Sequence, residues 1–279
     1  MQLQHALTFN LATTLTALLF SSHLSALGGE PMPAVSSGPR VGSRAMAVDL
    51  TPAFDQTGIA RRQQGDRPTC SVFTIAVALE FASSRRQPHE QLSVEFLNWA
   101  ANKVDRSHQD GGFFSDLWAG FMAHGICSEK HWPYRAQFDS AHSPDTQIRA
   151  LAKARLGLAL QLHWIKHWNV KTGLTDQQFE QIKETFRRGF PVCAGLRWPK
   201  SETWSQKVLG MCEPDAVQDG HSVLLVGYRD DVSQPGGGVF IFRNSNRDHD
   251  GLMPYEYARA YMNDALWIAG PGNSEGKQP

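Results

Sequence analysis

Apolar residues follow a helical spacing through the first half of the chain. The stretch "SVFTIAVALEFASSRR", directly after Cys70, is apolar on nearly every side, which predicts a buried helix. In "LSVEFLNWAANK", Ser93 precedes an apolar-periodic run as a capping residue, and a second helix is predicted there. A third helix is predicted for "FSDLWAGFMAHGI", where Gly125 stands at the position of a left-handed cap.

Past residue 155 the pattern changes to alternation and short β-branched runs. Strands are predicted for four stretches, "GLALQLHWIKHWNV", "FPVCAGLRW", "HSVLLVGYRD" and "GGGVFIFRNS". One helix interrupts them, "TDQQFEQIKETFRRG", which starts with a Thr/Asp cap and ends at a glycine. The segment "PGGGV", from Pro235 to Val239, is predicted to be a hairpin turn rather than a phosphate loop, because it opens a strand.

A helical half followed by a strand-rich half predicts an α+β fold, with a helical part at about residues 60–150 and a β-rich part at about 155–270. The two parts are expected to pack on one another and to leave a cleft between them. Clefts of this kind bind ligands.

The first residues differ from the rest of the chain. An apolar run of about fifteen residues followed by small residues predicts a signal peptide at 1–28, with an amphipathic or partly buried helix as the alternative. Residues 29–47 are rich in Pro, Gly and Ser and are expected to form a flexible leader before a domain at 48–272. Export to the periplasm or the outside is therefore predicted, with no stable membrane anchor after signal removal.

Charge and cysteine content narrow the possibilities. Lys and Arg total 27, Asp and Glu also total 27, and no basic cluster is dense enough to follow a phosphate backbone. Nucleic acid is therefore not an expected partner. The four cysteines are too few for a disulfide scaffold, and Cys193 with Cys212, which flank a loop, is the expected pair if one bond forms.

Cys70 is the candidate nucleophile. A cysteine at the start of a helix lies near the positive end of the helix dipole and near unpaired backbone amides, which favour the thiolate and predict that Cys70 is more acidic than the other cysteines. The alternative is a small core residue at a helix start.

A thiolate nucleophile needs an imidazole, and the imidazole needs an orienting group. His221 begins a buried strand and Asn244 ends the next, so both are expected at one edge of the sheet. The amide oxygen of Asn244 is then able to accept a hydrogen bond from the ring and select its tautomer. The alternative for Asn244 is an ordinary turn residue.

No metal and no cofactor are expected. His163 and His167 in "HWIKH" have the spacing of a helical zinc site, but they lie in a strand-like stretch without the accompanying glutamate. Cys127 and His131 lack a second ligand pair nearby in the sequence.

The order Cys70, His221, Asn244 resembles the papain family of cysteine peptidases. Further motifs follow in family order: Gln64 in "QGDRPTC", "LSVEFL", Gly111 and Gly112 in "DGGFF", "GICSEKHWPY", "GFPVCAGL", "GHSVLLVGY" and "FRNSN". The resemblance implies a two-lobe fold with a barrel-like β lobe, Gln64 as an oxyanion donor, Gly111 and Gly112 as backbone contacts for an extended polypeptide substrate, and hydrolysis through an acyl-enzyme.

Three positions depart from the family pattern. Arg67 stands where a structural cysteine is usual and Ser71 where a tryptophan follows the nucleophile, so one family disulfide is absent. Asn246 replaces the tryptophan that shields the bond between histidine and asparagine. Only about twenty residues separate the predicted signal peptide from the domain, so no long inhibitory propeptide is expected. The enzyme would then be secreted in active form, or its latency would come from cleft occlusion or from a proteinaceous inhibitor.

Two other functions are compatible with these residues. An acyltransferase or transpeptidase uses the same acyl-enzyme and passes it to an amine instead of water. A catalytically silent binding protein keeps the cleft without the chemistry, although retention of Gln64, Cys70, His221 and Asn244 together argues against it.

Overall fold

The computed structural model describes residues 46–246 and 250–272. The predicted signal peptide and nearly all of the predicted leader lie outside the described residues. The leader was expected to extend to residue 47, but Ala47 already begins a strand, β1 (Ala47–Asp49), which pairs with β6 (Val217–Asp230).

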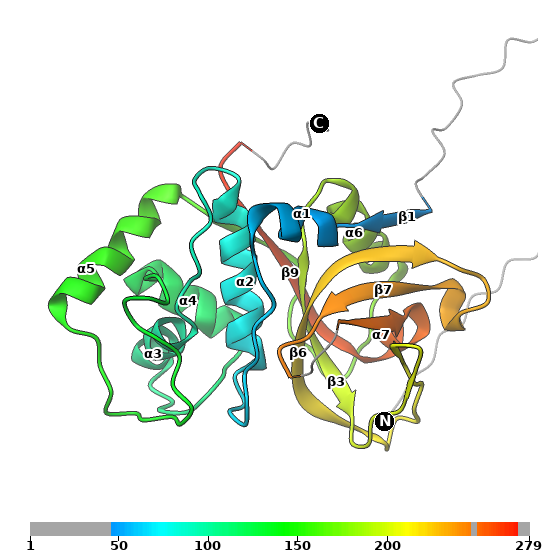
Figure 1. Ribbon diagram of the computed structural model, residues 1–279. Helices are drawn as coiled ribbons and strands as arrows, with labels where there is room; N and C mark the ends of the chain where they lie inside the picture. Colours follow the sequence, from blue (N-terminus) through cyan, green and yellow to red (C-terminus); the bar gives the residue numbers. More distant parts are fainter. Residues whose placement is uncertain (1–45, 247–249, 273–279) are drawn as a thin grey trace, which may run out of the picture. The chain divides into compact units, whose positions relative to one another are not determined.

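The first part of the described chain is helical, as predicted. Its helices are α1 (Thr51–Thr57), α2 (Cys70–Ser84), α3 (Val94–Asp105), α4 (Phe114–His124) and α5 (Thr146–Ala154), followed by a 3₁₀ turn, η1 (Arg155–Leu158). Ser93 caps α3 by accepting a hydrogen bond from the backbone N–H of Phe96, and Gly125 ends α4 with a positive φ of 74°. Helix α2 lies between helices α3, α4 and α5 on one side and the strands on the other (Figure 1).

The second part contains the predicted strands and several that were not predicted. The strands are β2 (Gln161–Lys166), β3 (Val192–Pro199), β4 (Trp204–Ser205), β5 (Val208–Leu209), β6, β7 (Gly238–Arg243), β8 (Gly251–Pro254) and β9 (Met262–Ala269). Two helices accompany them, α6 (Asp176–Arg187) and α7 (Tyr255–Tyr261). The "PGGGV" segment forms a 3₁₀ turn, η2 (Pro235–Gly237), that connects the antiparallel strands β6 and β7.

The strands form one sheet in the order β2-β9-β3-β6-β7-β8-β5-β4, and β1 pairs with β6. The first and last strands of this order do not pair, so the described sheet is open. The α+β fold is as predicted. The β-rich part, predicted to be barrel-like, does not form a closed barrel within the described residues.

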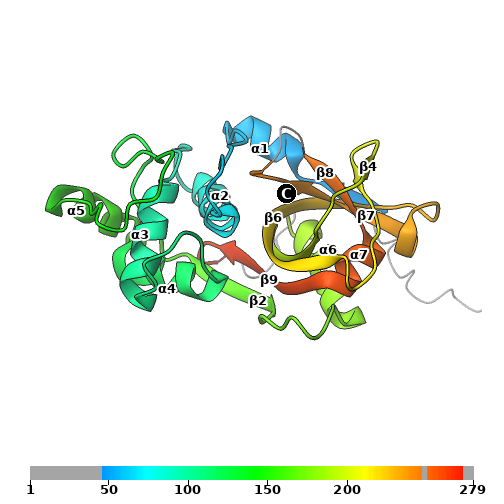
Figure 2. The same ribbon diagram turned by 90° about the horizontal axis from the view of Figure 1, so that it is seen from below.

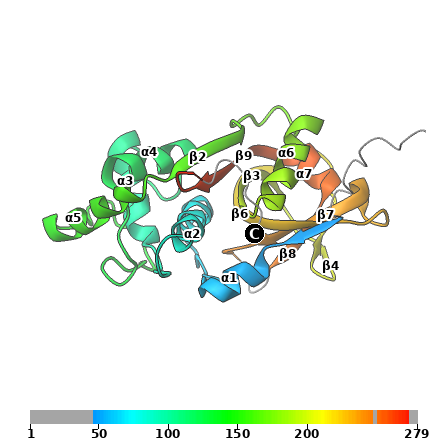
Figure 3. The ribbon, with the colours of Figure 1, turned by 90° about the horizontal axis from the view of Figure 1, so that it is seen from above.

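Alternate residues of β6 face two different cores. Leu224 and Val226 pack in the cluster that α2 shares with the other helices, whereas Val223 and Leu225 pack in the cluster that contains α6 and α7. Figures 2 and 3 show α2 on one side of β6, and α6 and α7 on the side away from α2. Burial of both faces explains why β6 is continuously apolar from Val223 to Val226 instead of alternating.

All four cysteines are free, so the expected bond between Cys193 and Cys212 is not present. The sulfur of Cys193 lies 3.8 Å from the backbone oxygen of Thr74 in α2, and Cys193 belongs to the core shared by α2 and the sheet. Cys212 packs against the other core. The two side chains therefore face different cores, which spacing in the sequence does not reveal.

The histidines of "HWIKH" are engaged with aromatic rings. His163 stacks on Trp267 and His167 stacks on Trp164. Within the described ranges, no three His, Cys, Asp or Glu side chains gather as metal ligands. Over the same residues, no helix has the length and apolar character needed to cross a membrane.

Candidate active site

Cys70 is the first residue of α2, and its side chain points toward the sheet. Cys70 is 8% exposed, and its sulfur lies 3.8 Å from the backbone oxygen of Gly220 in β6. The amide and hydroxyl of Ser222 also face this sulfur. The start of the buried helix therefore sets Cys70 against the strand that carries His221.

His221 and Asn244 come together because β6 and β7 are neighbouring antiparallel strands. The Nε2 atom of His221 is 3.1 Å from Oδ1 of Asn244, and both residues are buried. The same Oδ1 atom accepts a hydrogen bond from the backbone N–H of Asn246 at 3.1 Å. An amide oxygen held by two donors selects the tautomer in which Nε2 carries the proton, so Nδ1 is left as the basic nitrogen.

Gln64 lies beside the same site in the segment that leads into α2. Its backbone N–H donates to the backbone oxygen of Ser245, and its Oε1 accepts from the Ser245 hydroxyl at 2.7 Å. Its Nε2 donates to the backbone oxygen of Arg67 at 2.8 Å. That contact uses one of the two amide hydrogens, and Gln64 also lines a cavity together with Cys70 and His221.

Two cavities meet at Cys70 and His221. The larger one, of about 550 Å³, is lined in part by Gly112, Phe113 and Leu196, and the smaller one, of about 440 Å³, by Gln64, Trp198 and Asn246. Both include Cys70 and His221. A chain that crosses both cavities would therefore pass over the sulfur and the imidazole.

The two predicted glycines have different surroundings. Gly112 lines the larger cavity. Gly111 is buried behind it, where its N–H donates to Oδ1 of Asn98 and a Cβ would come within 2.5 Å of the Pro68 oxygen. With a φ of 75°, Gly111 allows a close approach that no other residue accommodates without strain.

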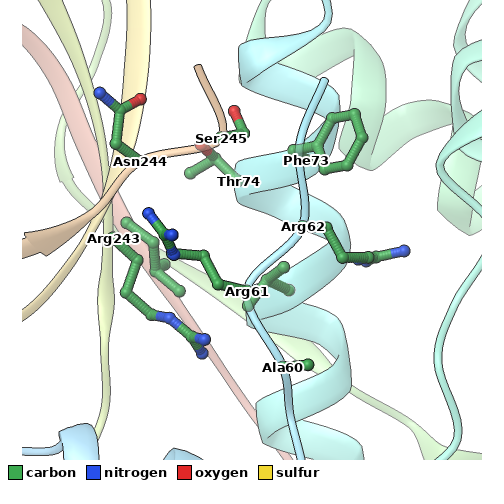
Figure 4. A pocket seen from close by; sticks show the side chains of 10 residues that line it. Ala60, Arg61, Arg62, Phe73, Thr74, Arg243, Asn244 and Ser245 are labelled. Atoms are coloured by element: carbon green, nitrogen blue, oxygen red, sulfur yellow. The ribbon is translucent and has the colours of Figure 1, made fainter. Parts of the chain in front are cut away.

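A third pocket lies behind Asn244 and holds only about 30 Å³ (Figure 4). Three arginines surround it, and each has a structural partner: Arg243 donates to the Ile59 oxygen, Arg62 pairs with Glu80, and Arg61 lies 3.8 Å from Asp250. A space of this size holds about one water molecule, so it is not a substrate site.

Comparison with solved structures finds several proteins of similar fold. Xylellain, a cysteine protease from Xylella fastidiosa, aligns with a TM-score of 0.63 and 23% identity over 82% of this chain and 87% of that one. Procathepsin L 3 of the Tenebrio molitor larval midgut aligns with a TM-score of 0.56 and 19% identity over 85% of this chain and 73% of that one. The cysteine protease and lectin-like domains of Cwp84 from Clostridium difficile align with a TM-score of 0.57 and 15% identity over 82% of this chain and 53% of that one.

The chain has the papain-like cysteine protease fold. No protein-family model matches the sequence, and no curated protein does. The fold is therefore visible in the arrangement of helices and strands, although the sequence has diverged to between 15% and 23% identity in these comparisons.

Arg67 occupies the position at which the papain-like pattern has a structural cysteine, and it is the centre of a buried ionic network. Its guanidinium contacts both carboxylate oxygens of Asp110 at 2.7 and 3.0 Å, Glu95 at 2.5 Å and the backbone oxygen of Arg135 at 2.7 Å. It also lies over the Tyr134 ring. Burial alone would lower the pKa of Arg67, but the bonds and charges of Asp110 and Glu95 outweigh burial and raise it above its ordinary value.

Trp198 covers His221 from β3. The two ring centroids are 4.4 Å apart at an interplanar angle of 60°, and Trp198 is itself anchored by a hydrogen bond from its Nε1 to Glu202. The substitution of Asn246 for the family tryptophan was expected to remove an indole from this region. Asn244 is nevertheless only 2% exposed, and a different indole, that of Trp198, packs against the histidine.

The environment of the Cys70 thiol differs from the sequence-based expectation. Burial raises the pKa of Cys70 above its ordinary value, while hydrogen bonds from Ser222 and from the Ser71 amide act in the opposite direction. The amides at the helix start thus act in the direction predicted from the sequence, but burial outweighs them, so the helix start alone does not produce a thiolate. A thiolate at Cys70 requires a further positive charge, and His221 lines the same two cavities.

Asp264 is a site residue that the sequence analysis missed. It lies in β9, is 4% exposed and lines the larger cavity, where burial raises its pKa to about 6, opposed by Lys166 and by the Gly195 amide. The only signal in the sequence is the pair Asn263–Asp264 at the start of an otherwise apolar run, "MNDALWIA". A carboxylate in such a run is buried at a cost unless a partner or a ligand offsets it.

Arg67→Met is expected to destabilise the fold by about 3–5 kcal/mol, because it leaves the carboxylates of Glu95 and Asp110 buried without their cation. Urea denaturation followed by circular dichroism measures the loss. The control is Lys130→Met, which removes a cation whose side chain is 68% exposed and should cost no more than about 1 kcal/mol. Equal effects of the two variants would show that the Arg67 network does not support the fold.

Asp264→Asn is expected to stabilise the protein at pH 7.5 but not near pH 4. The folded-state pKa of about 6 lies above the ordinary 3.8, so the cost of burying the charge is absent below pH 4, grows between pH 4 and 6 and is complete above. The gain should reach up to about 3 kcal/mol in urea denaturation. The control Asp55→Asn, at an exposed position in α1, should not differ from the parent at either pH. A gain from Asp264→Asn that is the same at both pH values would contradict this origin.

Proposed function

We propose that the protein is a cysteine peptidase that hydrolyses peptide bonds through a thioester acyl-enzyme at Cys70. The observation that carries this proposal is the meeting of two cavities at Cys70 and His221, with Gln64 lining the smaller cavity and Asn244 bonded to His221. The papain-like fold supports it, since a polypeptide crossing both cavities would present a peptide bond at the sulfur.

The chemistry follows from these contacts. The Cys70 sulfur attacks the carbonyl carbon, and the negative charge on oxygen is held by the second Gln64 amide hydrogen and by the Cys70 N–H. His221 gives its proton to the leaving amine as the C–N bond breaks. It then takes a proton from water, which attacks the thioester, releases the acid and restores Cys70.

The ion pair is the step that offsets burial at Cys70. Because burial raises the pKa of the thiol, the sulfur becomes nucleophilic only when its proton moves to His221. Asn244 orients the ring for this transfer by holding Nε2, and Trp198 keeps water away from that bond. Each charged group then stabilises the other inside a site that is largely closed to solvent.

Cys70→Ala should abolish cleavage of an unlabelled protein substrate such as casein, and Gln64→Ala should lower kcat by about 10²–10³ if its amide binds the oxyanion. Cys212→Ala serves as the matched control. Cys212 lies outside both cavities, so this substitution should leave activity unchanged.

Added amines that appear in the products would indicate acyl transfer instead of hydrolysis. Turnover retained by Cys70→Ala would refute the proposal, and a parent protein without turnover would leave binding as the function of the cleft.

Trp198→Ala should lower kcat about tenfold, a loss of about 1.4 kcal/mol in transition-state stabilisation, because water gains access to the bond between His221 and Asn244. It should also move the pH profile of Cys70 alkylation upward, since a less well oriented imidazole stabilises the thiolate less. Trp198→Phe keeps a ring over the histidine and should therefore retain most of the parent kcat and a pH profile of Cys70 alkylation close to that of the parent. An unchanged alkylation profile in Trp198→Ala would assign Trp198 a packing role alone.

A further inference from the structure

The larger cavity is acidic. Three carboxyl groups line it, those of Asp105, Asp116 and Asp264, whereas no lysine or arginine does so among the described residues. Asp105 ends α3, Asp116 lies in the first turn of α4 and Asp264 lies in β9. Two consecutive helices and a strand that is distant from them in the sequence thus bring negative charge to one cavity beside Cys70.

Asp264 has no cationic side chain within ion-pair distance in the part of the chain that the structure describes. Its carboxylate lies against Gly195, whose backbone amide is its hydrogen-bond partner. Lys166 is near enough to act on its charge, but the Lys166 ammonium donates to the backbone oxygens of Asn169 and Asn263. A buried carboxylate that lines a cavity of this size is therefore available to a ligand.

The other two carboxyl groups repel each other. Besides burial, the charge of Asp105 raises the pKa of Asp116, which places both groups in each other's field. Bringing a cation between like charges relieves this repulsion, whereas an apolar or anionic group leaves it or increases it. The Asp105–Asp116 pair therefore favours the same sign of ligand as Asp264.

Two exposed aromatic rings complete the cavity. Phe113 is 53% exposed and Trp168 is 49% exposed, and their ring centroids are 5.3 Å apart in an edge-to-face arrangement. Phe113 follows the glycine pair and Trp168 follows β2, so the rings approach from the helical part and from the sheet part. Aromatic faces next to carboxylates suit the alkyl stem and the charged end of a lysine or arginine side chain.

We propose that this cavity selects a lysine or arginine side chain of the polypeptide substrate, with Asp264 as its counter-ion and Phe113 and Trp168 packing along its stem. The proposal rests on the proposed function in one respect: the side chain belongs to a peptide that crosses Cys70. Binding of the cationic side chain does not depend on catalysis, because the cavity recognises the cation and the Cys70 thiol takes no part in this recognition.

The test uses internally quenched peptides that are identical except for one position, occupied by lysine or by norleucine, which has the same stem without the charge. That position is scanned through four residues on each side of the cleaved bond. At one position, lysine should raise kcat/KM at least about tenfold over norleucine, and Asp264→Asn should reduce the ratio to about one to three. Asp55→Asn, at an exposed position in α1, should retain the parent ratio.

The lysine preference should also fall as the pH is lowered from 7.5 to 5, since protonation of Asp264 removes the counter-ion. The other titratable or charged groups around it are Lys166 on β2, Cys193 on β3, and Asp105, Asp116, Cys70 and His221 across the cavity. The ratio for the two peptides cancels the common titration of Cys70 and His221. An Asp264→Asn variant that shows the same pH dependence of the ratio as the parent would assign the effect to another group and contradict the proposal.

A binding measurement separates this proposal from the proposed function. Isothermal titration of Cys70→Ala with the lysine and norleucine peptides should show tighter binding of the lysine peptide, and Asp264→Asn in the same background should remove the difference. Such a preference without any cleavage by the parent protein would support the cation site and refute the peptidase. Cleavage by the parent without a lysine preference at any position, or equal binding of the two peptides, would overturn the cation site alone.

Discussion

The buried guanidinium of Arg67 connects the segments from which the site is built. Its two carboxylate partners come from α3 and from the residue before Gly111, and its own backbone oxygen holds the side chain of Gln64. A buried cation is stable only when its donors are paired, so these segments must stay in place for the network to exist. These contacts are charges and hydrogen bonds, which are insensitive to thiol reduction.

The same low-dielectric environment acts on the groups that carry the chemistry. Burial raises the pKa of Cys70 and of Asp264, so each group is poorly compensated in the folded protein. For Cys70 the compensation would come from His221, which the protein itself supplies. For Asp264 it would come from a ligand, because the nearby ammonium of Lys166 is bonded to backbone oxygens. A site that holds uncompensated groups gives up stability, and binding or reaction recovers it.

Sequence patterns predicted the elements with strong local signals and missed those without them. Helices α2, α3, α4 and α6 have caps or long apolar runs. Strand β3 is a short apolar run, and strands β6 and β7 contain β-branched residues and are bounded by glycine or aspartate. Strand β9 was missed because its first residues include Asn263 and Asp264, which interrupt an apolar run. Helix α7 has only seven residues and follows β8 directly, so its pattern is too short to separate from that of the strands around it.

The sequence by itself determined the α+β order of elements and the position of a cysteine at the start of a buried helix, since both depend on local periodicity and capping. It also assigned His221 and Asn244 to two successive strands, which are neighbours in most antiparallel sheets. Asn244 does follow the end of β7, but His221 lies inside β6, which starts four residues earlier than the sequence pattern predicted. Only the tertiary structure decided that Cys193 and Cys212 face different cores, that Trp198 covers His221, and that three carboxyl groups surround one cavity. These relations join residues that are distant along the chain, and packing brings them together in a way that no local pattern encodes.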